Sequence, residues 1–227
     1  MIKFVLMDLD DTILDFSLAE HKALARTFEE FGVSVTEENV ALYSRINSSV
    51  WNKIEKGELT RSEALIQRFA LLFAHVGVQA DPQKTNDFYF ATLSQNADFI
   101  AGAKKLLEEL KGKYSLIAVS NGNSIVQWPR IKKAHLEDYF DKIFISQEIG
   151  YDKPSEKFFT KCFEQIENFN RDEAIILGDR LSSDVLGGQN AHIKTCWFNA
   201  KGKEATNIKP DFEIQSLSEF IGVLEQL

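Results

Sequence analysis

The chain has 227 residues, of which 44% are hydrophobic and 26% are charged, and 34 acidic residues outnumber 26 basic ones. This composition is typical of a globular protein with a sizeable core, and it excludes a largely disordered chain. The net charge of -8 argues against a nucleic-acid partner, because a polyanion would repel an acidic protein. Small phosphorylated ligands are compatible with this charge, since a bound metal ion can outweigh the overall field.

Nothing in the sequence indicates export or a membrane segment, so we expect a cytoplasmic protein. The apolar stretch from Ile2 to Met7 contains Lys3 and is too short for a signal-peptide core. No apolar run approaches the roughly 18 residues that span a bilayer. The two cysteines, Cys162 and Cys196, are too few for a disulfide framework and favour a reducing compartment.

The first part of the chain predicts one strand followed by helices. A short apolar run, Phe4 to Met7, is typical of a strand buried on both faces. From about residue 17 to about residue 90 the apolar residues recur at helical spacing, which predicts a module of about four helices. Gly57 and the Asp81-Pro82 pair mark breaks between these helices.

Short strands then alternate with helices. We expect helices over 103–110, 124–134 and 183–191, and strands over 116–119, 143–145, 174–177, 195–198 and 212–214, the last at an edge. Pro129 is expected to bend or end its helix, and Pro154 to begin another in its first turn. The alternation predicts an α/β fold with a doubly wound parallel sheet. Residues 1–16 and 97–227 would form this core domain, with a helical insertion over 17–96.

Polar side chains follow the predicted strands at their carboxyl ends, where open α/β sheets bind ligands. These motifs are Asp8-Leu9-Asp10-Asp11-Thr12, Ser120-Asn121, Lys153, and Gly178-Asp179 with Asp184 five residues on. Clustered carboxylates repel one another unless a cation lies among them, and an all-oxygen ligand set suits Mg²⁺. Lys153, Ser120 and Asn121 could then donate to the oxygens of a phosphoryl group. Each motif alone fits a turn or a helix cap, but their conjunction favours one site.

The four motifs resemble those of the haloacid dehalogenase (HAD) superfamily, in which they run the length of the chain. The resemblance implies a HAD-like Rossmannoid core with a helical cap inserted after the first strand. It implies that Asp8 attacks phosphorus to form an aspartyl-phosphate, and that Asp10 acts as general acid and base. The metal, Mg²⁺, would be held by Asp8, the backbone carbonyl of Asp10, Asp179 and Asp184.

The resemblance also implies that Ser120, Asn121 and Lys153 bind the phosphoryl group. Dehalogenases of this fold attack carbon without a metal and lack a carboxylate at the position of Asp10. Because this chain has Asp10, the resemblance implies phosphate chemistry.

Further strings resemble bacterial pyrimidine 5'-nucleotidases of the superfamily, which implies hydrolysis of nucleoside 5'-monophosphates. They are Trp51 with Gly57-Glu58-Leu59-Thr60, Ser120-Asn121-Gly122-Asn123 with Gln127 and Arg130, Ser183-Asp184-Val185-Leu186-Gly187-Gly188, and Thr195-Cys196-Trp197-Phe198-Asn199. Trp128-Pro129 departs from the pattern and is expected to shift Arg130, which we interpret as structural. In the cap, Asn47, Trp51 and Arg68 are the candidate substrate contacts, with Arg61 a further residue of interest.

Other functions stay open at this point. The chain could hydrolyse small sugar phosphates such as phosphoglycolate, or it could be a phosphomutase of the same fold. A non-catalytic binding module is a third alternative, which the intact motifs disfavour. In each case the expected partner is a small-molecule phosphate ester, with no nucleic acid or membrane, and the protein would be a monomer or homodimer.

Overall fold

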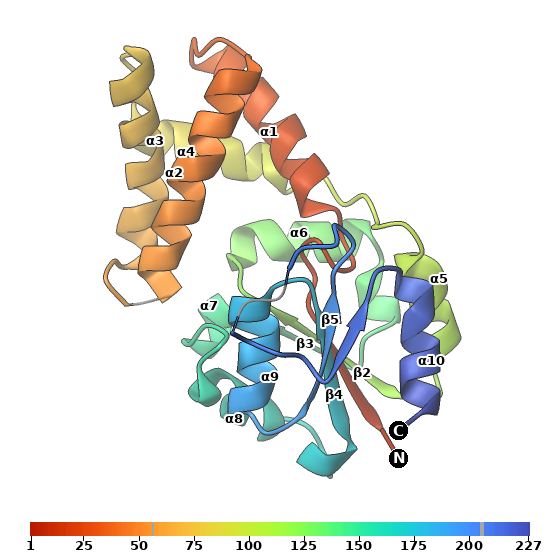
Figure 1. Ribbon diagram of the computed structural model, residues 1–227. Coiled ribbons are helices and arrows are strands. Elements are labelled where there is room, and N and C mark those ends of the chain that lie inside the picture. Colours follow the sequence, from red (N-terminus) through yellow and green to blue (C-terminus); the bar gives the residue numbers. More distant parts are fainter. Residues whose placement is uncertain (56, 205–206) are drawn as a thin grey trace. The chain divides into compact units, whose positions relative to one another are not determined.

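The computed structural model of the chain describes residues 1–55, 57–204 and 207–227 (Figure 1). The chain divides into two compact units. The core unit comprises Met1–Phe16 and Ala97–Leu227, and the helical unit comprises Ser17–Asn96. Within the described ranges, no helix is long and apolar enough to cross a membrane. The cytoplasmic location stays a prediction.

The core unit is built on a six-stranded parallel sheet. Its strands are β1 (Phe4–Met7), β2 (Ser115–Ser120), β3 (Lys142–Ile145), β4 (Ala174–Gly178), β5 (Lys194–Phe198) and β6 (Phe212–Ile214). Their order is β3-β2-β1-β4-β5-β6, and every neighbouring pair is parallel. The predicted α/β fold is thereby confirmed, with β6 at an edge. The strand order reverses between β1 and β4, the position at which such sheets bind ligands.

Helices cover both faces of the sheet, because its strands are apolar on both sides. These helices are α5 (Ala103–Leu110), α6 (Ser124–Lys133), α7 (Ser146–Ile149), α8 (Glu156–Phe163), α9 (Leu186–Asn190) and α10 (Phe220–Glu225). Val5 and Met7 of β1 share one apolar cluster with α5, α6 and α10, whereas Phe4 and Leu6 share another with α8. Figure 1 shows α5 and α10 on one side of the sheet and α8 and α9 on the other.

Three local expectations need correction. Of the two outcomes expected for Pro129, the end of the helix is excluded, because α6 continues to Lys133; a bend at Pro129 stays a prediction. Pro154 does not begin a helix: α8 begins at Glu156, where the hydroxyl of Ser155 caps it by accepting from the N–H of Lys157. The helix expected over 183–191 starts earlier, as a π-helical turn over Leu181–Val185 that leads into α9.

The helical unit contains α1 (Phe16–Glu30), α2 (Glu37–Glu55), α3 (Arg61–Val76) and α4 (Pro82–Leu93), which confirms the expected module of about four helices. Side-chain caps define two of the helix starts. The hydroxyl of Thr60 accepts from the N–H of Glu63 at the start of α3. The Asp81 carboxylate accepts from two N–H groups at the start of α4. Aromatic rings then fill the interior, with Tyr43 against Phe28, Phe69 and Tyr89.

Candidate active site

The polar residues that follow β1, β2 and β4 meet at the carboxyl edge of the sheet. In the observed register Met7 of β1 is level with Ala118 of β2 and Leu177 of β4. Asp8, directly after Met7, donates its N–H to the carbonyl of Leu177 at 2.9 Å. Because the three strands are parallel and neighbouring, Ser120 and Asp179 reach the same edge as Asp8.

A buried lysine lies among these carboxylates. The Nζ atom of Lys153 is 2.7 Å from a carboxylate oxygen of Asp8 and 2.7 Å from one of Asp184. It also donates to the carbonyl of Val119 at 2.7 Å. Lys153 is 1% exposed, so its charge is shielded from water and interacts strongly with both carboxylates.

Burial and mutual repulsion disfavour ionised carboxylates here. Burial raises the pKa of Asp8 well above its usual range, with Lys153 acting against this shift and Asp184 adding to it. Burial and the Asp184 charge raise the pKa of Asp179 to about 7. Burial would lower the pKa of Lys153, but Asp184 and Asp8 outweigh it and keep the pKa above its ordinary value. The lysine is therefore a cation, and one positive charge faces several acids.

Three of these carboxylates could hold a metal ion. Asp8, Asp179 and Asp184 each offer one oxygen, and the three oxygens lie within 4.8 Å of one another. The Oδ1 atom of Asp179 is buried without a hydrogen-bond partner among the described residues. A buried polar atom left unbonded is costly, and a hard divalent cation would satisfy it. The donor set therefore fits Mg²⁺, the cation expected from the sequence.

Gly178 at the end of β4 leaves room for the Asp184 side chain beside Asp8 and Asp179. A Cβ atom on Gly178 would lie 2.4 Å from the carboxylate carbon of Asp184, so only glycine leaves room for that side chain. The remaining oxygen of Asp184 accepts from the N–H of Arg180 at 3.0 Å. The carbonyl of Asp179 accepts from the indole of Trp197 at 2.9 Å. These contacts fix the orientation of both acids.

Ser120, the last residue of β2, and Asn121, which follows it, lie at the same edge of the sheet as the acids. The Oγ atom of Ser120 accepts from Nε2 of Gln127 at 2.7 Å. Asn121 makes a reciprocal pair with the backbone of Lys153: its Nδ2 donates to the carbonyl, and its Oδ1 accepts from the N–H, both at 2.8 Å. The side chain of Asn121 thus holds the segment that carries Lys153. The predicted contacts of Ser120, Asn121 and Lys153 with a phosphoryl group stay predictions.

Comparison with known proteins identifies the family. Residues 5–198 match the model of the haloacid dehalogenase-like hydrolases. The chain belongs to this family.

Several members of the family match almost the whole chain. The protein YfnB of Bacillus subtilis is 36% identical over 97% of this chain and 94% of its own. Its crystal structure, bound to magnesium, has a TM-score of 0.94 and covers 98% of both chains. The pyrimidine 5'-nucleotidase PynA of Streptococcus pneumoniae is 33% identical, over 99% of this chain and 95% of its own. The pyrimidine 5'-nucleotidase YjjG of Escherichia coli is 32% identical, over 99% of this chain and 96% of its own.

A relative with another name also matches over much of its length. The glyceraldehyde 3-phosphate phosphatase of Pyrococcus abyssi is 30% identical, over 87% of this chain and 82% of its own. The predicted membership of the superfamily is confirmed, and this chain is a HAD-family phosphatase that acts on phosphoric monoesters.

In this HAD phosphatase, α6 supplies two side chains that the sequence analysis did not assign to the site. Arg130 lies 2.5 Å from a carboxylate oxygen of Asp10, so Pro129 does not displace it from the site as expected. Gln127 donates to the other oxygen at 2.9 Å. The Gln-x-x-Arg spacing after Asn121-Gly122 was the available signal, because residues three apart share one helix face.

The candidate substrate contacts of the helical unit lie in or near its interior. Arg68 is 2% exposed, and it donates to Asn47 at 2.9 Å and to Asn86 at 3.0 Å. Asn47 in turn donates to Glu20 at 3.0 Å. These contacts link all four helices through one polar network. Their role toward a substrate stays a prediction.

Trp51 is half-buried, and the guanidinium of Arg61 lies 5.5 Å from the centre of its ring. This contact pairs the two residues within the helical unit. A role for Trp51 toward a substrate likewise stays a prediction.

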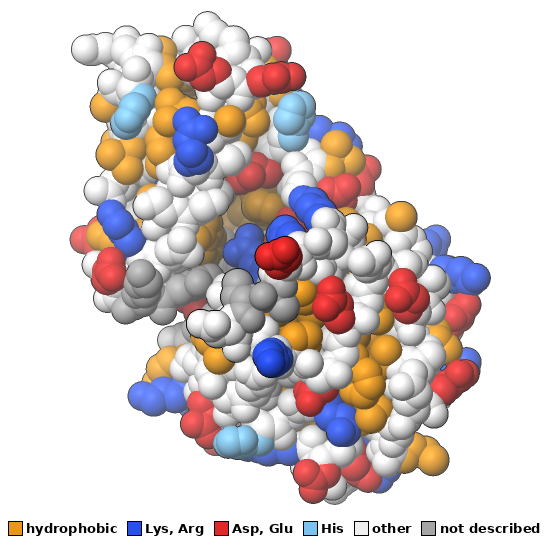
Figure 2. All heavy atoms as spheres, viewed as in Figure 1, with side chains coloured by type: hydrophobic (Ala, Val, Ile, Leu, Met, Phe, Trp, Pro, Cys, Tyr) orange, Lys and Arg blue, Asp and Glu red, His pale blue; other side chains and the backbone are white. Residues whose placement is uncertain are grey.

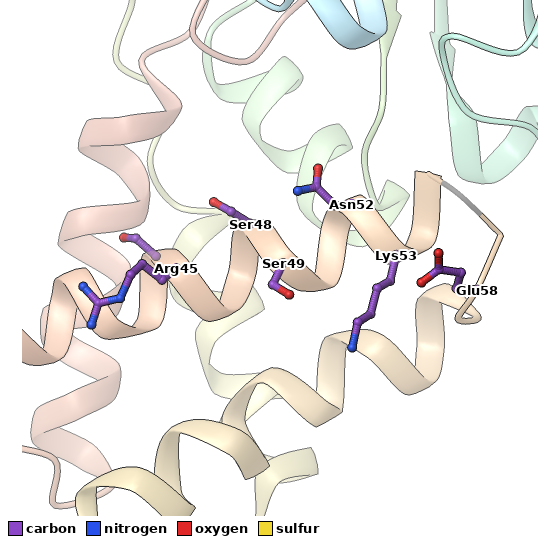
Figure 3. A pocket seen from close by; sticks show the side chains of 7 residues that line it. Arg45, Ser48, Ser49, Asn52, Lys53 and Glu58 are labelled. Atoms are coloured by element: carbon purple, nitrogen blue, oxygen red, sulfur yellow. The ribbon is translucent and has the colours of Figure 1, made fainter.

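The helical unit also has a surface groove of about 620 Å³ along α2 (Figure 3). It is lined by Ser44, Arg45, Ser48, Ser49, Asn52, Lys53 and Glu58. Figure 3 shows Arg45, Ser48, Ser49, Asn52 and Lys53 spaced along α2, with Glu58 on the segment that follows, and they do not converge on one point. Neither Asn47 nor Arg68 lines this groove, and we assign it no role.

The surface charges agree with the acidic composition. On the face drawn in Figure 2, Lys and Arg side chains are interspersed with Asp and Glu side chains. The expected absence of a nucleic-acid partner stays a prediction.

The raised pKa of Asp179 makes the stability of the metal-free protein depend on pH. Its folded-state pKa of about 7 exceeds its ordinary value of 3.8, so the folded state binds the proton more tightly. This contribution to stability is present at low pH and is lost as the pH rises through 7. In EDTA we expect the melting temperature to fall between about pH 5 and about pH 8 by several degrees.

Thermal unfolding followed by circular dichroism measures this effect. The Asp179→Asn variant should lose part of the decline and keep the part that comes from the raised pKa of Asp8. The exposed control Asp138→Asn should keep the whole decline. Equal slopes for wild type and Asp179→Asn would show that another group governs the pH dependence.

Proposed function

We propose that this phosphatase is a Mg²⁺-dependent 5'-nucleotidase that prefers pyrimidine nucleoside 5'-monophosphates. The metal-dependent hydrolysis is supported by the group of Asp8, Asp179 and Asp184 around the buried Lys153. The substrate preference is supported by the two nucleotidases that match nearly the whole chain at 32% and 33% identity.

Asp8, Asp179 and Asp184 would hold the metal through their carboxylates, and Asp10 through its backbone carbonyl. Bound Mg²⁺ would neutralise the acids and polarise the oxygens of the phosphoryl group. An ionised Asp8 is required for nucleophilic attack, and a divalent cation offsets the burial and repulsion that raise its pKa.

The proposed reaction has two displacements at phosphorus, first by Asp8 and then by water. A carboxylate oxygen of Asp8 forms a bond to phosphorus, while the bond from phosphorus to the ester oxygen breaks and Asp10 gives its proton to that oxygen. Asp10 next takes a proton from water as the water oxygen bonds to phosphorus and the bond to Asp8 breaks. Lys153, Ser120 and Asn121 stabilise the charge on the transferred group. Asn121 holds the segment of Lys153.

We further propose that the helical unit is the cap that selects the substrate. A cap that closes over such a site excludes water and supplies contacts to the part of the substrate beyond the phosphate. Asn47, Trp51 and Arg68 are the residues proposed for this role, directly or by fixing the shape of the unit.

A panel of phosphate esters tests the proposed function. We would measure phosphate release from UMP, CMP, dTMP, AMP, phosphoglycolate and glyceraldehyde 3-phosphate, each with Mg²⁺ and with EDTA. The expected result is release that requires the metal, with kcat/KM for pyrimidine nucleotides on the order of tenfold or more above the other esters. Undiminished release in EDTA would contradict the proposed metal dependence.

The same panel decides the alternatives. The Pyrococcus abyssi relative favours a sugar-phosphate phosphatase as the second candidate. If glyceraldehyde 3-phosphate or phosphoglycolate gave the highest kcat/KM, the chemistry would stand and the nucleotide preference would be wrong. Isomerisation of a sugar phosphate without free phosphate would identify a phosphomutase. No turnover of any ester would favour a binding module.

A further inference from the structure

Both carboxylate oxygens of Asp10 are held by side chains of α6. Nη1 of Arg130 donates to Oδ1 at 2.5 Å, and Nε2 of Gln127 donates to Oδ2 at 2.9 Å. These contacts join residues 120 and 117 positions apart in the sequence. The plane of the Asp10 carboxyl group is therefore fixed by two donors from one helix face.

Arg130 and Gln127 are also hydrogen-bonded to each other. Nη1 of Arg130 donates to Oε1 of Gln127 at 2.8 Å, and Nε2 of Gln127 also donates to Ser120 at 2.7 Å. The guanidinium of Arg130 lies 5.6 Å from the centre of the Phe16 ring. Arg130 is fully buried, whereas the side chain of Asp10 is 25% exposed. Buried donors therefore hold the Asp10 carboxyl group, while part of the same side chain is accessible to solvent.

The backbone before α6 makes room for this arrangement. A Cβ atom on Gly122 would lie 2.6 Å from Cγ of Gln127, inside van der Waals contact. Asn123 caps α6 by accepting from the N–H of Ile125. The start of the helix and the path of the Gln127 side chain are therefore fixed together.

We propose that Gln127 and Arg130 are positioning residues that aim the Asp10 carboxyl group at the leaving oxygen of the substrate. Each donor occupies one lone pair of one oxygen, so each oxygen keeps a second position at which a proton can be carried or accepted. The Asp10 side chain is 25% exposed, which leaves the carboxyl group accessible. The inference rests on the proposed function, because it assigns a purpose to Asp10 as the acid. A displacement of about 1 Å in a reacting group can cost on the order of 10²-fold in rate.

The test compares leaving groups. A nucleotide leaves as a basic alkoxide and needs a proton, whereas p-nitrophenyl phosphate leaves as a stable phenolate and needs little help. We expect Arg130→Met and Gln127→Met to lower kcat/KM for UMP by on the order of 10²-fold, but for p-nitrophenyl phosphate by less than about fivefold. kcat/KM is the suitable quantity, because it reports the first displacement and is independent of hydrolysis of the intermediate.

Several variants make this comparison specific. Arg130→Lys should recover part of the loss with UMP, since it keeps the charge but not the planar fork. Gly122→Ala should mimic Gln127→Met, because it forces that side chain to move. Lys132→Met, an exposed change on the same helix, is the matched control and should leave both substrates unaffected. Melting temperatures would verify that each variant is folded.

An equal loss with both substrates would show that the two residues only support the fold, and no loss would show that they are dispensable; either result overturns the inference. Gln127→Met keeps the test available if Arg130→Met does not fold.

The Asp10→Asn variant separates this inference from the proposed function. If Asp10→Asn shows the leaving-group dependence and the α6 variants do not, only the inference fails. If wild type releases no phosphate from any ester, the proposed function fails.

Discussion

Replacing Asp8 with asparagine is expected to abolish phosphate release, with a loss of kcat on the order of 10⁴-fold or more. Asparagine has nearly the same shape but offers a poorly nucleophilic amide, so no aspartyl-phosphate can form. It also removes one of the three carboxylates proposed to hold the metal. Steady-state phosphate release from UMP with saturating Mg²⁺ measures the effect.

A matched control distinguishes loss of the nucleophile from loss of the fold. Asp138→Asn makes the same chemical change at an exposed position of the core unit and should keep wild-type turnover. Circular dichroism of Asp8→Asn should show a folded protein, because Asp8 packs at the end of a strand whose apolar residues are unchanged. Wild-type turnover by Asp8→Asn would contradict the covalent route.

Replacing Lys153 with alanine is expected to impair both catalysis and stability. The phosphoryl group loses a cation, and the loss of one such donor costs on the order of 10²–10³ in kcat. Asp8 and Asp184 lose the buried charge that pairs with them, and breaking a buried pair costs about 3–5 kcal/mol. Because Lys153 is 1% exposed, water cannot replace it without rearrangement.

Phosphate release and thermal unfolding with and without Mg²⁺ measure the two effects separately. Mg²⁺ should restore part of the stability of Lys153→Ala, since it neutralises the same carboxylates, but not the turnover. Lys161→Ala, an exposed change on α8, is the control and should alter neither quantity. Normal turnover by a stable Lys153→Ala protein would exclude the lysine from phosphoryl transfer.

The sheet and its catalytic edge could be predicted because both follow from local patterns. Short, uniformly apolar runs such as Phe4–Met7 are typical of strands buried on both faces, and their alternation with helices predicts parallel pairing. Asp8 and Asp179 directly follow such runs, so their meeting at one edge follows from the topology. The acidic cluster was foreseeable for this reason.

The contacts around Asp10 were not foreseeable from spacing. Arg130 and Asp10 are separated by 120 positions, and no local pattern states which way a helix turns its face. Pro129 suggested that Arg130 would be displaced. In the structure the helix passes through the proline, and Arg130 stays on the same face as Gln127.

The side-chain partners of Asn121 and Arg68 show the same limit. Asn121 is predicted to donate to a phosphoryl group, and this stays a prediction. The structure adds a pairing of its amide with the backbone of Lys153, which no local pattern indicates. Arg68 was singled out as a substrate contact, and the structure shows it bonded to Asn47 and Asn86 inside the helical unit. A sequence shows which side chains can form hydrogen bonds, but long-range packing determines which partners they bond to.

Detection of a phosphorylated Asp8 tests the central claim most directly. Wild type, Asp10→Asn and Asp8→Asn would be mixed with Mg²⁺ and p-nitrophenyl phosphate, whose leaving group needs little help from Asp10. The mixtures would be quenched in acid within one turnover and analysed by intact mass and peptide mapping. We expect one added phosphoryl group on the peptide that carries Asp8, and none in Asp8→Asn. The group should accumulate most in Asp10→Asn, because the first displacement of this substrate is little slowed while the hydrolytic water is not activated. Phosphate release without any phosphoryl group on Asp8, or with the group on another residue, would contradict it.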